Sequence, residues 1–211
     1  MLTVAHFQVI SIASALGAAH WGMHDPAAVA FCGSKAGWVF MLVAINLTPV
    51  LAQWGARQSQ GLGLVMLAFD GALSGLALCP LLSMAHHKAP GSIEMAAILT
   101  GTAFAMVSLC VLLSPREIFP VRGSFLSSAG LVLIVGILLN GLLFHLAALH
   151  LMLCVAVGVY GVVMLVYTTN ELRGKRVDNG VEGALLLFAS LFNIFVSILN
   201  ILVSTRSKSD D

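Results

Sequence analysis

A single acidic side chain, Asp70, lies deep inside a long apolar segment, residues 61–83. A carboxylate near the middle of a membrane costs at least about 2.5–3.5 kcal/mol on insertion scales, so it needs a partner, a water-filled cavity or a proton. We interpret Asp70 as a protonated or water-exposed group on an ion path. The alternative is a permanently neutral structural carboxyl bonded to a neighbouring helix. Ser74 follows one turn later, and Gly71 with Gly75 forms a GxxxG face that favours close approach of another helix.

A polar stripe runs along the last apolar segment, within the charge-free run 183–205. Its members recur at steps of three and four residues, which places them on one face of a helix. The members are Ser190, Asn193, Ser197, Asn200 and Ser204. Such a face is expected to contact other helices or a wet cavity, because lipid cannot satisfy its polar groups. One reading is helix packing by interhelical hydrogen bonds, worth about 0.6 kcal/mol each. The other is a hydrated path or binding cavity along this helix.

The sequence contains no recognisable catalytic arrangement. There is no HExxH, no GxSxG, no glycine-rich phosphate loop, no CxxC pair and no pair of intramembrane aspartates. His145 and His150 flank a predicted turn at a spacing unsuited to metal binding on one helix face. We interpret Asn140 and His150 as polar residues at helix interfaces. The sequence therefore predicts a protein that is not an enzyme and has no metal or cofactor.

The composition explains which elements must position these residues. Of 211 residues, 59% are hydrophobic and only 9% are charged, with a formal net charge of +1. Soluble domains carry about 25% charged residues, and disorder requires low hydrophobicity, so both classes are excluded. A nucleic-acid partner is also unsupported, because the chain has no basic patch. The composition predicts an integral membrane protein in contact with lipid.

The distribution of charges predicts an all-α bundle of seven membrane-spanning helices in one domain, residues 1–211. A helix needs about 20 apolar residues to cross the hydrocarbon layer, and a barrel would show short alternating segments instead. The charge-free run 123–170 is long enough for two spans and a tight turn. The predicted spans are 2–19, 37–56, 61–83, 93–113, 125–144, 149–168 and 183–203. Breakers such as Asp25-Pro26 mark the loops.

Basic residues predict the orientation, with the N-terminus in the cytoplasm and the C-terminus outside. In that orientation the outer loops hold only Lys35 and Lys88, and the C-terminal tail holds Arg206 and Lys208. The inner loops hold Arg57, Arg116, Arg122, Arg173, Lys175 and Arg176. The first span lacks the basic region of a signal peptide, so we expect it to remain as an uncleaved helix.

The segment from residue 140 to residue 203 resembles a known family. Its motifs are ALHL at 148–151, VYTTN at 166–170 and SLFNIFVSILNIL at 190–202. Together they resemble the C-terminal helices of the Bax inhibitor-1 (TMBIM) family, in its bacterial YccA-like branch. The glycine-rich stretch GALSG at 71–75, followed by Pro80, is similar to the family's third helix. The resemblance covers the whole chain in topology and is most specific in this C-terminal part.

The resemblance implies a Bax inhibitor-1-like bundle in the inner membrane, with the last helix central. In the wider family an acid near the end of helix six and another in helix seven form a pH-responsive pair that gates a calcium leak. The matching positions here are Thr168 and Ser190, so both acids are absent. YccA-like members are associated instead with inhibiting the membrane-anchored AAA protease FtsH and with its HflK–HflC partners.

Two functional hypotheses follow. The first is a non-enzymatic inner-membrane regulator that resembles YccA and modulates FtsH by binding within the membrane. The second is a calcium, other cation or proton leak of Bax inhibitor-1 type. The residues that would line such a path are Asp70, Ser74, Thr168, Ser190, Asn193, Ser197 and Asn200.

Overall fold

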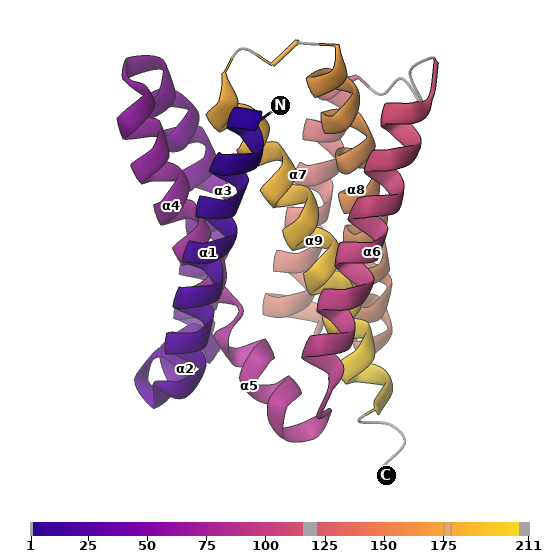
Figure 1. Cartoon of the computed structure of the whole chain (residues 1–211). Coiled ribbons are helices and arrows are strands. Elements are labelled where there is room, and N and C mark those ends of the chain that lie inside the picture. The colour runs from indigo at the N-terminus through magenta and orange to yellow at the C-terminus, as the bar shows by residue number, and fades with distance from the viewer. Residues whose placement is uncertain (1, 116–121, 175, 178, 207–211) are drawn as a thin grey trace. The chain divides into compact units, whose positions relative to one another are not determined.

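The computed structural model describes residues 2–115, 122–174, 176–177 and 179–206. Within these ranges all regular secondary structure is helical, which confirms the predicted all-α class. The helices are α1 (Leu2–His24), α2 (Pro26–Gly33), α3 (Lys35–Gln58), α4 (Gln60–Ala77), α5 (Cys79–Lys88), α6 (Ser92–Leu113), α7 (Gly123–Leu139), the π-helix η1 (Asn140–Phe144), α8 (Ala147–Arg173) and α9 (Gly180–Arg206) (Figure 1).

Six stretches of the described chain are long and apolar enough to cross a membrane. They are α3, α4, α6, α7 together with η1, α8 and α9. Each overlaps a predicted span. The predicted first span, 2–19, forms the 23-residue helix α1. Its role as a seventh span stays a prediction, as does the central place of the last helix.

Two loop signals in the sequence have a different effect in the structure. Asp25 and Pro26 were expected to mark a loop, but they begin the short helix α2. The Asp25 side chain accepts a hydrogen bond from the Ala27 N–H at 2.9 Å, and Pro26 occupies the first helical position. Both residue types favour a helix start at these positions, because the helix leaves its first N–H groups unpaired.

The predicted span 61–83 consists of two helices, and the break lies beside Pro80, where a proline inside a span predicts a kink or a helix end. The helix α4 ends at Ala77, and α5 begins at Cys79 after the intervening Leu78. Pro80 explains this break, because its ring lacks an N–H donor and crowds the carbonyl of the residue four positions earlier. The Leu78 N–H instead bonds the Gly75 carbonyl in a tighter turn, at 3.2 Å.

The chain divides into two compact units, and the first comprises residues 1–83 and 175–188. In this unit α4 packs closely against both α1 and α3. A Cβ built on Gly71 would overlap the Ser11 carbonyl on α1, and one built on Gly75 would overlap the Ala15 carbonyl. The predicted GxxxG face is therefore confirmed, since the two glycines let the backbones of α1 and α4 approach.

The second unit comprises residues 84–174 and 189–211. Its helices α7 and α8 form an antiparallel hairpin around a turn at His145 and Leu146. Small residues on α7 face large ones on α8: Gly130 lies against the Tyr160 hydroxyl, and Gly136 lies against Leu153. The turn falls between the predicted spans 125–144 and 149–168, as expected.

An arginine joins the ends of two helices in the second unit. Arg173, in the last turn of α8, donates hydrogen bonds to the carbonyls of Val111 at 2.8 Å and Ser114 at 2.6 Å. These carbonyls belong to the end of α6, where the helix leaves its last C=O groups unpaired.

Of the residues used to predict orientation, Arg116, Lys175 and Lys208 lie outside the described residues. The orientation stays a prediction.

Candidate functional site

In the first unit, Asp70 meets a hydroxyl from a neighbouring helix. The Thr48 hydroxyl on α3 donates a hydrogen bond to Asp70 Oδ1 on α4, with the oxygens 2.5 Å apart. Thr48 is 5% exposed and Asp70 is 3% exposed, so the pair is removed from the surface of the chain. The pair therefore gives a buried carboxyl one fixed hydrogen-bond donor.

Pro49 directly follows Thr48 inside α3, so one backbone N–H donor is absent beside this pair. A proline within a helix has no N–H, so the carbonyl four residues earlier loses its usual helical donor. A polar side chain and a freed carbonyl thus occur in neighbouring turns of α3. Ser74, one turn beyond Asp70 on α4, is also buried. The interior of this unit is accordingly more polar than a purely apolar helix pair.

The polar stripe of the last helix meets α8 in the second unit. The Ser197 hydroxyl donates a 2.7 Å hydrogen bond to the Cys154 carbonyl on α8. A Cβ built on Gly158 would overlap the Ser197 hydroxyl, so this contact requires a glycine. One turn away, Asn193 Cβ lies 3.1 Å from the Cβ position of Gly161. Ser197 and Asn193 therefore lie against glycines of α8.

Two other predicted path residues form bonds within their own helices. Asn200 Nδ2 donates to the Val196 carbonyl at 2.9 Å, and the Thr168 hydroxyl donates to the Met164 carbonyl at 2.8 Å. Thr168 and Ser190 are both fully buried. The resemblance implies that the family's gating acids fall at these two positions, where this chain carries hydroxyls.

Asn140 and His150 differ in their surroundings. Asn140 is buried, and its Oδ1 accepts a hydrogen bond from the Leu146 N–H at 3.0 Å. Its backbone carbonyl also accepts from the His145 N–H, so Asn140 holds the turn between α7 and α8. His150 is exposed, and its ring lies 3.6 Å from the Cys154 sulfur on the same helix. The structure thus gives His150 an intrahelical partner.

The predicted residues are distributed over both units. Asp70 and Ser74 belong to the first unit. The others belong to the second: Asn140, His150, Thr168, Ser190, Asn193, Ser197 and Asn200. Within the second unit the structure brings Ser197 and Asn193 to the face of α8. That these residues line an ion path or a cavity stays a prediction.

Sequence reasoning missed Thr48, although a signal was present. Ser59 lies between α3 and α4. Thr48 precedes Ser59 by the same number of residues as Asp70 follows it. In an antiparallel pair joined by a tight turn, such residues come opposite each other. Sequence reasoning also missed Gln8, which is 6% exposed. Neither its Nε2 nor its Oε1 has a hydrogen-bond partner among the described residues.

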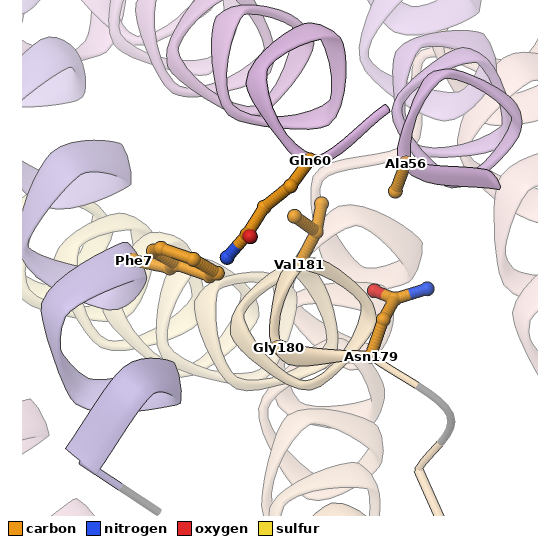
Figure 2. A pocket seen from close by; sticks show the side chains of 6 residues that line it. All are labelled: Phe7, Ala56, Gln60, Asn179, Gly180 and Val181. Carbon is orange, nitrogen blue, oxygen red and sulfur yellow. The ribbon is translucent and has the colours of Figure 1, made fainter. Parts of the chain in front are cut away.

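One cavity lies at the beginning of α9 in the first unit (Figure 2). It measures about 250 Å³ and is lined by Phe7, Ala56, Gln60, Asn179, Gly180 and Val181. Asn179 is already engaged, since its Oδ1 accepts from the Glu182 N–H at 2.8 Å and caps α9. The lining holds two amides and one aromatic ring but no titratable side chain. Its lining thus offers amide donors and acceptors but no acid or base.

Comparison with known proteins establishes the family. The model for the inhibitor of apoptosis-promoting Bax1 matches residues 2–207. The chain belongs to the Bax1-I family. The resemblance in the C-terminal motifs is therefore confirmed, and the match extends over nearly the whole chain. Membership agrees with the several apolar helices, since this is a family of multi-span membrane proteins.

Bacterial relatives are moderately similar. An uncharacterized protein of Campylobacter jejuni is 34% identical over 174 residues, which cover 81% of this chain and 73% of the relative. One from Helicobacter pylori is 28% identical over 166 residues, covering 78% of this chain and 70% of the relative. One from Neisseria meningitidis is 30% identical over 136 residues, and the match spans 59% of that protein.

Proposed function

We propose that this Bax1-I family protein is a non-enzymatic inner-membrane regulator that modulates the membrane-anchored AAA protease FtsH by binding within the membrane. The observation that carries the proposal is the close packing of α8 and α9. Ser197 bonds the Cys154 carbonyl, and Gly158 makes room for it. The most YccA-like part of the chain thus uses the Ser197 hydroxyl for helix packing.

The outward faces of the second unit offer a surface for such binding. Several large apolar side chains on its long helices are exposed, among them Ile98, Leu113, Val132, Met152 and Val159. In a membrane these side chains contact lipid or the transmembrane helices of another protein. Because lipid tails are as apolar as leucine, helix association there depends on shape and packing. A regulator acting through its helices requires this kind of rigid apolar face.

Site-specific photo-crosslinking in native membranes tests the proposal. A photo-reactive phenylalanine analogue is placed at exposed Val132 or Val159, and adducts are identified by mass spectrometry. We expect adducts with FtsH or with HflK–HflC from at least one exposed position. The same analogue at fully buried Leu165 serves as the matched control and is expected to give none. Absence of these subunits from every adduct would contradict the proposal.

The buried pair of Thr48 and Asp70 favours a second candidate, a proton or cation leak. An intramembrane carboxyl is costly and is commonly associated with ion pathways or proton relays. Here it has a fixed donor at 2.5 Å and lies in the interior of the first unit. The candidate function is passage of protons or calcium at Asp70.

Flux measurements separate the two candidates. Purified protein is reconstituted into liposomes loaded with a calcium or pH dye, at mildly acidic and mildly alkaline pH. A leak at Asp70 predicts flux above that of empty vesicles, abolished by Asp70→Asn. Glu94→Gln is the control, because Glu94 is an exposed acid in the first turn of α6. Flux equal to that of empty vesicles at both pH values would remove this candidate.

A further inference from the structure

Two buried cysteines of the first unit belong to segments that are far apart in the sequence. Cys32 lies in the last turn of α2 and is 4% exposed. Cys79 is the first residue of α5 and is fully buried. Both thiols are free. Neither belongs to the candidate sites described above.

Direct contacts place the two segments against each other. A Cβ built on Gly22, at the end of α1, would overlap the Cys79 sulfur. The Cβ position of Gly33, next to Cys32, lies 3.9 Å from Pro80, next to Cys79. The residues that follow the two cysteines, Gly33 and Pro80, therefore lie side by side, and a disulfide requires that the cysteines do so as well.

We propose that Cys32 and Cys79 form a site of oxidative modification, at which a disulfide links α2 to the start of α5. Among the described residues no group of three histidines, cysteines or acids is arranged to hold a metal ion. The predicted orientation places α2 outside the cytoplasm, in a compartment where disulfides persist. The proposal rests on that orientation.

The oxidant in this step is the disulfide of a thiol oxidase. One cysteine attacks that disulfide as a thiolate and forms a mixed disulfide, and the second then displaces the remaining oxidase sulfur. Two thiols lose two electrons and two protons, and the oxidase disulfide becomes two thiols. Burial raises the pKa of the Cys32 thiol. Less thiolate is then present at neutral pH, so the exchange is expected to be faster under alkaline conditions.

The bond would reinforce a weak place in the chain. The helix α4 ends at Ala77, and Pro80 prevents its continuation into α5. A link from Cys79 to Cys32 would hold the start of α5 against α2 despite this interruption. The reduced protein keeps only noncovalent contacts there.

Differential alkylation of the full chain in native membranes tests the proposal. Free thiols are blocked with a maleimide under denaturing conditions, disulfides are reduced, and the released thiols are labelled with a heavy maleimide. We expect two heavy labels per chain, on Cys32 and Cys79, and a linked peptide in the unreduced digest. Cys32→Ser and Cys79→Ser should each reduce the count to none.

Cys154→Ser is the matched control, because Cys154 is buried in the second unit. This variant should keep both heavy labels. The proposal is overturned if all thiols of the wild-type chain are free in native membranes. It is equally overturned if Cys32 or Cys79 is linked to a different cysteine.

Discussion

Replacing Thr48 by valine is expected to destabilise the first unit through Asp70. Valine keeps the shape of threonine but removes the hydroxyl that donates to Asp70 Oδ1 at 2.5 Å. Because both side chains are buried, water cannot readily replace the lost donor. Leaving a buried polar group unpaired costs about 1–3 kcal/mol, whereas interhelical bonds in one membrane protein reached at most about 1.7 kcal/mol.

From these limits we expect Thr48→Val to lower the free energy of unfolding by about 1.5 kcal/mol, roughly a tenfold change in the equilibrium constant. Thr48→Ser keeps the hydroxyl and should cost less. Asp70→Asn keeps an oxygen that can accept from Thr48, so it should also be mild. The ordering of these three variants distinguishes a lost donor from a general loss of packing.

The assay is reversible unfolding of the purified protein in mixed detergent micelles, followed by circular dichroism. A double-mutant cycle with Asp70→Leu isolates the pairwise interaction. Thr48→Val should have almost no effect in the Asp70→Leu background, because the acceptor is already absent. An equal loss of stability in both backgrounds would refute the reasoning, since the hydroxyl would then act independently of Asp70.

Three further predictions concern helix packing. Gly71→Val should weaken the close approach of α1 and α4 and lower the unfolding midpoint, whereas Gly101→Val should not, because the Cβ position of Gly101 has no neighbour within 4 Å. Ser197→Ala should cost only about 0.6 kcal/mol in the same unfolding assay, and a much larger loss would mean that the hydroxyl does more than pack α9. Asn140→Ala should speed amide hydrogen exchange in the turn between α7 and α8, because it removes the side-chain acceptor there; unchanged exchange would show that the turn holds without it.

The main helices were predictable because their signals are local. Long charge-free runs mark α6, α7, α8 and α9, and the hairpin turn at His145 falls in the gap between two predicted spans. The role of Gly71 was predictable for a related reason, since the spacing of small residues on a helix indicates which face packs against another helix. These features depend on residues within one or two turns of each other.

The partners of the site residues depend on register between helices, which the spacing within one helix does not specify. Nothing in the stripe identifies Gly158 as the neighbour of Ser197, and Asp70 alone does not point to Thr48. The break at Leu78 is a different case. The apolar run continues through it, and only Pro80 within that run indicates that a helix bends or ends there.

The central claim is that the chain acts on FtsH within the membrane, and a degradation assay tests it most directly. FtsH is reconstituted into proteoliposomes with a membrane-protein substrate, with or without the full-length chain, and substrate loss is followed over time. The account predicts slower degradation when the chain is present, with no effect from an unrelated membrane protein at the same density. Identical degradation rates with and without the chain would contradict it.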